Sequence, residues 1–407
     1  QAAILAPTPR FRQGSSLFAS CRNANCNPRQ SMRSLLSPVV HAVVLVALTG
    51  SATDDHVVCD GDAATCDGEI SSLVQRLVHV RLGKGAEALG VALCMDATDI
   101  SAPMAALHAV WTSDFEQAEG LKASIASAID ATSVPLVAHV LVEQSLEAKF
   151  QRFLGLPQGC RSARLGERAM LQLHDFDADT VRHAEPVIPQ KILERRGGLD
   201  AVENFARFYM HKLIPGVKVA VYLDADTIVQ SDLAGLRDEF IVSNKTIGFA
   251  QRGTPKCLGE DSLGDAPPCD FCTLNMWQQL RGMPEYNAGV YIVDLERWAR
   301  RHLLERVENL ARLQSECDGG LWEGGSQPLL LMALYTAEGG LGSDIDELED
   351  SWNTDGLGWM AFDGHADLKA AKVLHWSGSG KPWLEGANYA SFWRPHRERY
   401  DALIHSQ

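Results

Sequence analysis

Two aspartates separated by a single residue follow an apolar segment near the middle of the chain. Residues 219–223 read Val-Ala-Val-Tyr-Leu, and Asp224-Ala225-Asp226 comes directly after them. A short, continuous apolar run is typical of a buried strand, so both carboxylates are expected where that strand ends. Paired carboxylate oxygens suit a hard divalent cation such as Mn²⁺ or Mg²⁺. The residue types and their spacing therefore predict a metal site at Asp224 and Asp226.

A cation at this place would assist the departure of a diphosphate. Such a leaving group gains negative charge as its bond breaks, and a bound cation neutralises that charge. Because Asp-x-Asp also arises often by chance, the preceding strand matters. A second acidic run at residues 175–179 (Asp-Phe-Asp-Ala-Asp) follows residues 171–174 (Leu-Gln-Leu-His), which include two polar side chains. We expect this second run to be a solvated turn or the start of a helix.

The elements around the aspartate pair alternate in type. Apolar, β-rich runs predict four strands, and two longer segments predict helices, the first rich in Ala and Leu and the second ending before Pro215-Gly216. Such alternation indicates an α/β fold with a parallel sheet covered by helices, in which ligands bind beyond the carboxyl ends of the strands. The strands are expected at Val91–Met95, Pro135–Val142, Ala169–Leu173 and Val219–Leu223, and the helices at Met104–Ala128 and Ala201–Leu213.

The overall charge excludes one class of partner. The 407 residues carry a formal net charge of −15. A general nucleic-acid binder needs a broad basic face to neutralise phosphates, so we expect no nucleic-acid partner. A small anionic ligand remains compatible with this charge, because a metal ion and a few local cations can hold it.

The beginning of the chain is typical of a secretory signal. Met32-Arg33 forms a short basic start, residues 35–48 are mostly apolar, and residues 50–52 (Gly-Ser-Ala) are small, as at a signal-peptidase cleavage site. The apolar run is short for a membrane span, so a cleaved signal is favoured over a membrane anchor, which stays open. We expect residues 1–31 to lie outside the mature protein, 32–52 to be the signal peptide or signal anchor, 53–87 a stem, and 88–400 the catalytic domain.

Ten cysteines fit an oxidising compartment. Cys59 and Cys66 lie close together, and a second group comprises Cys257, Cys269, Cys272 and Cys317. The Cys-x-x-Cys spacing of residues 269–272 also matches half a zinc site, but disulfides are favoured in a secreted chain. We expect a location in the Golgi or endoplasmic reticulum lumen, or secretion.

Further segments carry a family resemblance, in the family's order along the chain. They are Val91–Asp96 with Ser101–Ala106, Asn204–Tyr209, Tyr286–Leu295, Ser351–Gly358 and Leu374–Trp383. Together with the aspartate pair they resemble glycosyltransferase family 8, in particular its plant galacturonosyltransferase-like branch, over roughly residues 91–393. The resemblance implies a GT-A type nucleotide-diphospho-sugar transferase fold with a Rossmann-like, mostly parallel sheet, and a reaction that retains the anomeric configuration.

The resemblance also implies roles for the last segment. His375 follows an apolar run, so it is expected to end a strand, and the family match makes it the third metal ligand. A neutral imidazole suits Mn²⁺ better than Mg²⁺. Gly378 would allow close backbone approach to a diphosphate, and Lys381 would donate to the phosphate oxygens.

Four other residues are assigned by the same resemblance, three of them with an ordinary alternative. Arg207 would face the donor site, or else pair with Glu203 on the helix surface. Asp96 would bind uracil or ribose, or else cap a helix. Asn287 would bind sugar hydroxyls, or else be a turn residue. Gln327 would steady the sugar, so we expect Gln327, Asn287 and Asp226 as the catalytic group.

The chain departs from its relatives at two places. Many relatives have a base-stacking Tyr three residues after the position of Asp96, where this chain has Asp99. Many also have Asp-Gln-Asp where this chain has Ser326-Gln327-Pro328. With no acid at Ser326 to act as a nucleophile on the far face of the sugar, we favour front-side attack, in which the leaving phosphate takes the acceptor's proton.

The sequence thus predicts a Mn²⁺-dependent retaining glycosyltransferase that moves a hexose or hexuronate from a UDP-sugar to a glycan or glycoconjugate acceptor. One alternative is a catalytically impaired nucleotide-sugar- or carbohydrate-binding pseudoenzyme, suggested by the two departures. A remote alternative is a haloacid dehalogenase-type phosphatase, which also has an aspartate pair after an apolar strand. Against it, Ile228 stands where that class has Thr or Val, and its Gly-containing turn is missing.

Overall fold

The computed structural model describes residues 106–181, 201–252, 256–265, 274–317, 320–322, 325–337, 342–359 and 367–405. The elements fall within one compact unit that spans residues 81–407. Several predictions lie outside the described residues: the signal at 32–52, the stem at 53–87, the strand at Val91–Met95, Asp96, and the cysteines at 59, 66, 269 and 272.

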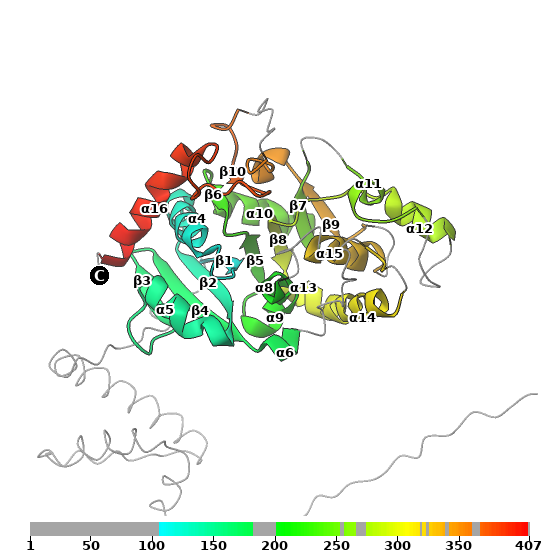
Figure 1. Cartoon of the computed structure of the whole chain (residues 1–407), viewed down its shortest axis with the longest axis horizontal. Coiled ribbons are helices and arrows are strands. Elements are labelled where there is room, and N and C mark those ends of the chain that lie inside the picture. Colours follow the sequence, from blue (N-terminus) through cyan, green and yellow to red (C-terminus); the bar gives the residue numbers. More distant parts are fainter. Residues whose placement is uncertain are drawn as a thin grey trace, which may run out of the picture. The chain divides into compact units, whose positions relative to one another are not determined.

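A mixed eight-stranded sheet forms the centre of the fold (Figure 1), with the strand order β3-β4-β2-β1-β5-β8-β7-β9. The pairs β4-β2, β2-β1, β1-β5 and β7-β9 are parallel, and β8 runs antiparallel to both β5 and β7. A small second sheet pairs β10 with β6. The strands are β1 Leu107–Thr112, β2 Leu136–Glu143, β3 Ser162–Leu165, β4 Ala169–Phe176, β5 Val219–Leu223, β6 Thr227–Val229, β7 Ile247–Ala250, β8 Val290–Asp294, β9 Ile345–Leu348 and β10 Val373–His375.

Helices cover the sheet, and the C-terminal helix α16 lies against α4 (Figure 1), where Arg397 contacts Glu119 at 2.7 Å. The helices are α4 Ala118–Ala131, α5 Glu147–Phe153, α6 Ala178–Val181, α8 Val202–Ala206, α9 Met210–Leu213, α10 Leu233–Ser243, α11 Leu258–Asp261, α12 Leu274–Arg281, α13 Leu295–Arg300, α14 Leu303–Glu316, α15 Ser326–Tyr335 and α16 Ala390–His405. Short 3₁₀ turns are η2 Gln144–Leu146, η4 Arg207–Tyr209 and η5 Asp350–Asn353.

The central strands are apolar on both faces because the sheet is covered on both sides. Along β5, Ala220 and Tyr222 belong to one buried cluster, while Val221 and Leu223 belong to another. This alternation follows from the two-residue period of a strand. A strand buried on both faces has no room for charge in its interior, so the first carboxylates after β5 appear where it leaves the core. The predicted strands at 135–142, 169–173 and 219–223 are confirmed as β2, β4 and β5.

The prediction of a helix over Met104–Ala128 is wrong in its first half. Residues 107–112 form β1, which pairs in parallel with β2 and β5, and the helix begins only at Ala118. The Ala- and Leu-rich composition suggested a helix, but Val110-Trp111-Thr112 is β-branched and aromatic and fills a central place in the sheet. Tertiary pairing therefore outweighed local helix propensity.

Two other local predictions hold. The second acidic run is the end of β4 followed by the start of α6, where Asp177 accepts from the backbone N–H of Asp179 at 3.1 Å. Asp175 forms an ion pair with Arg161 at 2.6 Å. The helix expected at 201–213 is present as α8, η4 and α9 in succession.

The described residues contain no helix long and apolar enough to cross a bilayer. Cys160 and Cys317 each take part in a disulfide bond. Cys257 is a free thiol, so its expected place in a disulfide is not found.

Candidate functional site

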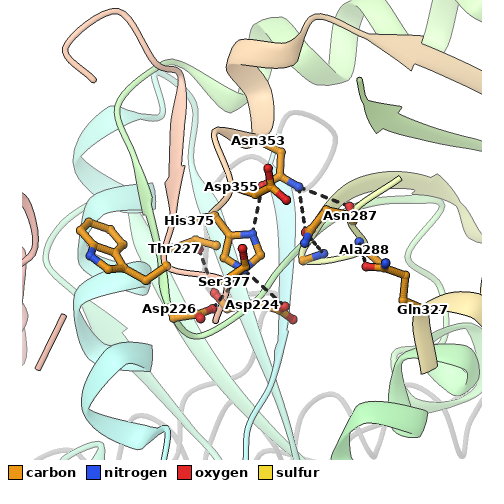
Figure 2. A network of polar contacts seen from close by, with 12 residues as sticks. Asp224, Asp226, Thr227, Asn287, Ala288, Gln327, Asn353, Asp355, His375 and Ser377 are labelled. Atoms are coloured by element: carbon orange, nitrogen blue, oxygen red, sulfur yellow. Dashed lines mark hydrogen bonds and ion pairs between the residues drawn. The ribbon is translucent and has the colours of Figure 1, made fainter. Parts of the chain in front are cut away.

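The two aspartates and His375 meet at the carboxyl end of β5. β6 begins immediately after Asp226 and pairs antiparallel with β10, so that Thr227 lies opposite His375. This register brings the imidazole over the aspartate pair (Figure 2): His375 Nε2 lies 3.4 Å from Asp226 Oδ1 and 3.8 Å from Asp224 Oδ2. One potential ligand atom from each of the three residues lies within 4.8 Å of the others. The predicted grouping of Asp224, Asp226 and His375 is therefore present.

Two asparagines orient the His375 ring (Figure 2). The Asn353 amide donates to Asn287 Oδ1 at 3.1 Å, which leaves the Asn353 carbonyl oxygen as the acceptor for His375 Nδ1 at 3.0 Å. Nδ1 of His375 therefore carries a proton, and Nε2 is the ring nitrogen that faces the carboxylates. Holding the far nitrogen by a hydrogen bond is the usual way in which a protein fixes the tautomer of a metal-binding histidine.

Asp226 is buried and held from two sides. Its Oδ2 accepts from Lys381 Nζ, which also donates to the Trp376 carbonyl at 3.2 Å. Burial alone would raise the pKa of Asp226, but His375 and Lys381 outweigh it and hold that pKa well below its usual range. Asp226 is thus ionised at neutral pH, as a metal ligand must be.

Asp224 is held by a buried arginine and a tyrosine. Arg207 Nη2 lies 3.3 Å from Asp224 Oδ1, and the Tyr222 hydroxyl donates to the same oxygen at 3.0 Å. The guanidinium also donates to the Ala288 carbonyl at 2.8 Å and lies 4.4 Å from the centre of the Tyr222 ring. Burial alone would lower the pKa of Arg207, but Tyr222 and Asp224 outweigh it and raise that pKa. Arg207 therefore faces the aspartate pair, as the resemblance implied.

A chain of hydrogen bonds, formed by one indole N–H and two hydroxyl groups, fixes the turn between the two aspartates. Trp111 Nε1 donates to Ser124 Oγ at 2.8 Å, and Ser124 Oγ lies 2.8 Å from Thr227 Oγ1. Thr227 Oγ1 in turn donates to the Asp224 backbone carbonyl at 2.8 Å. Side chains from β1 and α4 thus set the spacing of the carboxylates.

Gly289, just before β8, leaves the space that the side chains of Asp224 and His375 occupy. A Cβ built on Gly289 would lie 2.6 Å from Asp224 Oδ2 and 2.8 Å from His375 Nε2. The Gly289 carbonyl also accepts from the Asp224 N–H at 2.7 Å. The resemblance included Gly289 within a matching segment but gave it no role; the Asn-Ala-Gly turn before an apolar strand was the available signal.

The two predicted sugar-contacting residues flank this same turn (Figure 2). Asn287 Oδ1 accepts from the Gly289 N–H at 2.9 Å, and Gln327 Oε1 accepts from the Ala288 N–H at 2.9 Å. Gln327 Nε2 donates to Glu285 Oε1 at 3.0 Å, and Glu285 is a buried acid that no sequence pattern had marked. Asn287 therefore takes the turn role named as its alternative, and Gln327 fixes the backbone beside the metal cluster.

The glycines near Lys381 make room for a neighbouring backbone. A Cβ on Gly380 would lie 2.7 Å from the Gly358 carbonyl, and one on Gly378 would lie 3.0 Å from the Trp359 ring. The Gly380 N–H donates to the Gly358 carbonyl at 2.8 Å. In this structure the close approach permitted by Gly378 is to the 358–359 loop, and Lys381 binds Asp226. The contacts expected between these residues and a diphosphate stay predictions.

Asp96 lies outside the described residues, so its expected role stays a prediction, but a second acid follows a central strand of the sheet. β1 occupies the central position between β2 and β5, and Asp114 follows it, accepting from the Gln117 N–H at 2.8 Å. The apolar run at residues 109–111 followed by a polar turn and an acid was the missed signal. The residue three positions after Asp114 is Gln117, so a Tyr is missing at this place as well.

The donor set fits a divalent cation. Two carboxylate oxygens and one imidazole nitrogen face one another, which matches the ligand preferences of Mn²⁺. The charges of Asp224 and Asp226 are balanced by Arg207 and Lys381, so a divalent ion would leave the cluster with a net charge of about +2. Such a cluster is complementary to a diphosphate.

The family model for glycosyl transferase family 8 matches residues 108–387, and the chain belongs to this family. The chain is a glycosyltransferase with a GT-A fold. Family membership excludes the phosphatase alternative.

Individual relatives agree with this assignment. The chain is 26% identical over 321 residues to the probable galacturonosyltransferase-like protein 3 of Arabidopsis thaliana, covering 73% of this chain and 82% of that protein. It is 30% identical over 297 residues to the probable galacturonosyltransferase-like protein 7 of the same plant, covering 68% and 70%. Among solved structures, the apo form of WbbM, a bifunctional glycosyltransferase, matches with a TM-score of 0.50 at 15% identity, covering 77% of this chain but only 53% of that larger protein.

Proposed function

We propose that the protein transfers a hexose or hexuronate from a UDP-sugar to a glycan or glycoconjugate acceptor, with retention of configuration and with Mn²⁺ at Asp224, Asp226 and His375. The observation that carries the proposal is the convergence of two carboxylates and an oriented imidazole between two cationic side chains. A divalent ion held there would supply positive charge to the departing UDP. Mg²⁺ is the second choice, because imidazole is a less natural ligand for it.

In this proposal the residues of the chain bind and orient the reactants. Arg207 pairs with Asp224 and Lys381 with Asp226, and Lys381 would turn to the diphosphate when the donor arrives. Gln327 and Asn287 hold the 287–289 turn on which the donor sugar would rest. Because Ser326 stands where many relatives have an acid, front-side attack, with the leaving phosphate accepting the proton of the acceptor hydroxyl, stays the favoured course.

The choice of donor sugar is guided by the names of the relatives and not by the metal cluster. The names of the two Arabidopsis thaliana relatives describe them as probable galacturonosyltransferase-like proteins. Galacturonate is therefore the first sugar to try, with galactose and glucose as neutral comparisons. The secretory lumen is the proposed location, supported by the signal-like residues 32–52 and by the disulfide-bonded Cys160 and Cys317; this segment serves as a cleaved signal or as an anchor.

The experiment is a donor panel with the purified full chain. UDP release is measured from UDP-galacturonate, UDP-galactose and UDP-glucose with Mn²⁺, with and without a mixture of plant and animal glycan acceptors. Release from one sugar above the others would identify the donor. Mn²⁺-dependent UDP binding with no release from any sugar on any acceptor would instead favour a binding protein over the proposed transferase.

A further inference from the structure

A third cationic side chain lies at the same edge of the sheet as the metal cluster. Arg252 follows β7, whose last paired residues run antiparallel to the first residues of β8, with Phe249 opposite Tyr291. β8 begins one residue after Gly289, which lies against the side chains of His375 and Asp224. The end of β7 therefore lies beside the start of β8, near the metal cluster. Arg252 follows the end of β7 at this edge of the sheet.

Arg252 lies beside the loop that holds the His375 ring. Its Nη2 is 3.8 Å from Asp355 Oδ2, and Asp355 follows by two residues Asn353, whose side-chain oxygen accepts from His375 Nδ1 at 3.0 Å. The backbone around Asp355 is fixed to β10, since the Leu357 N–H donates to the His375 carbonyl at 3.2 Å. Figure 2 shows Asp355 beside Asn353 and His375.

The Arg252 guanidinium differs from the other two cations of the site in being incompletely bonded. Arg207 and Lys381 each bind a carboxylate of the metal pair. In the part of the chain that the structure describes, Arg252 Nε is buried and has no hydrogen-bond partner. The 3.8 Å separation from Asp355 is too long for a hydrogen bond. A buried N–H left without a partner is energetically unfavourable.

The exposure of this pair permits a ligand to reach it. The Arg252 side chain is 17% exposed and that of Asp355 is 22% exposed, so the guanidinium is largely desolvated but open at one side. A guanidinium presents a planar fork of N–H donors that matches the two oxygens of a carboxylate. Because the diphosphate is accounted for at the metal cluster, the anion expected at Arg252 belongs to the sugar side of the reaction.

We propose that Arg252 determines specificity for an acidic sugar by binding the carboxylate of a hexuronate residue. This inference rests on the proposed transferase function and names the sugar class within it. The hexuronate belongs either to the donor or to the acceptor, since both offer the same planar carboxylate. Asp355 lies beside the guanidinium without a hydrogen bond to it, so the outer Nη groups of the fork can bind a uronate carboxylate.

The test compares Arg252→Gln with wild type for acidic and neutral sugars in two arms. In the donor arm, kcat/KM is measured for UDP-galacturonate and UDP-galactose with one acceptor. In the acceptor arm, oligogalacturonides are compared with neutral galactose oligomers, using one donor. We expect Arg252→Gln to lower kcat/KM about 10- to 100-fold for the acidic sugar in one arm, with changes below about threefold for its neutral counterpart, because a lost charge-assisted pair is worth roughly 1.5–3 kcal/mol. The arm that shows the loss identifies the source of the carboxylate.

Two controls keep the result specific. Arg312→Gln removes an exposed arginine that pairs with Glu316 on α14 and is expected to leave all four values unchanged. Arg252→Lys keeps the charge but not the fork, and an intermediate loss is expected. Thermal melting of each variant reports whether it is folded.

Binding measurements separate this inference from the proposed function. Galacturonate and galactose oligomers are titrated into the full chain with Mn²⁺ and UDP, using saturation-transfer NMR. A wild type that prefers the acidic ligand, a preference lost in Arg252→Gln, supports the inference even if no sugar is transferred, in which case only the proposed function fails. Equal effects on acidic and neutral sugars in both arms, or no effect on either, would overturn the assignment of Arg252.

Discussion

Gly289 lies directly against the imidazole of His375, close enough that a Cβ at this position would come within 2.8 Å of the Nε2 that faces the aspartates. The same Cβ would lie 2.6 Å from Asp224 Oδ2. Real Cβ atoms do not approach polar atoms this closely, so any other residue would push the ligands apart. The metal cluster therefore depends on a residue that supplies no ligand.

Replacing Gly289 with Ala should damage metal binding without unfolding the chain. We expect the affinity for Mn²⁺ to fall at least about tenfold, because displaced ligands bind metal poorly. Calorimetric titration of Mn²⁺ measures this. Gly235→Ala is the matched control: Gly235 lies in α10 with no atom near its would-be Cβ, so it should leave Mn²⁺ affinity unchanged and stabilise the helix by up to about 1 kcal/mol. Equal Mn²⁺ affinity in both variants would show that Gly289 has no special role.

The orientation of His375 by Asn353 can be tested separately. Asn353→Ala removes the acceptor for Nδ1 and frees the ring to rotate, so we expect Mn²⁺ affinity to fall about 10- to 100-fold. Turnover at saturating Mn²⁺ should recover most of the loss, because the three ligands remain. A loss of turnover that no concentration of Mn²⁺ restores would argue that Asn353 acts on the substrate instead.

Gln327 should affect turnover more than metal binding. It anchors the Ala288 N–H and donates to the buried Glu285, so Gln327→Ala should lower kcat about 10- to 100-fold without abolishing it. Gln327→Glu should be worse, since it places a second carboxylate beside Glu285 and removes the donor. Initial rates at saturating donor, with Mn²⁺ affinity as the control, make the comparison. Wild-type turnover in Gln327→Ala would contradict the role given to this side chain.

Stability should fall in mild acid because of a hydrogen-bonded row of histidines across the sheet. His108 Nδ1 lies 2.9 Å from His139 Nε2, and His139 Nδ1 lies 2.9 Å from His174 Nε2. Burial lowers the pKa of all three, to about 4 for His174. The pKa of His174 is 6.5 in the unfolded chain and about 4 in the folded chain. Between these two pH values the unfolded chain binds a proton at this residue and the folded chain does not, so stability is lost as the pH falls through this range. Each histidine that stays neutral in the folded chain lowers the free energy of unfolding by about 1.4 kcal/mol for every unit by which the pH falls.

The measurement for this prediction is the melting temperature at pH 7.5, 6.0 and 5.0. We expect a decline in the wild type and a shallower decline in His174→Gln, which retains hydrogen-bonding capacity but does not titrate. Parallel declines in both proteins would show that other groups cause the loss.

The sequence revealed those parts of the site that depend on a local pattern. The strand at Val219–Leu223 and the aspartates after it were readable because a buried strand must be apolar and its end is where charge can appear. Family resemblance was needed to predict His375, Arg207 and Lys381, because the sequence around each of them does not indicate which residues it contacts. Asn353 and Glu285 act through contacts with distant segments, which depend on how β8, β10 and α15 are placed and so cannot be read from local spacing.

For β1 the local sequence predicted the wrong type of element. Its Ala- and Leu-rich surroundings favour a helix, and only the position between β2 and β5 makes it a strand. Because β1 was not predicted, Asp114, the acid that follows it, was not considered beside Asp96 as a candidate on the nucleotide side.

The central claim is that Asp224, Asp226 and His375 hold a divalent ion on which sugar transfer from a UDP-sugar depends. The most direct measurement is UDP release by the wild type and by Asp226→Asn, each with Mn²⁺, then with EDTA, then with Mn²⁺ restored. We predict that the wild type loses release in EDTA and regains it with Mn²⁺, and that Asp226→Asn loses nearly all release under every condition while staying folded. Undiminished release in EDTA, or wild-type release by Asp226→Asn, would contradict the account.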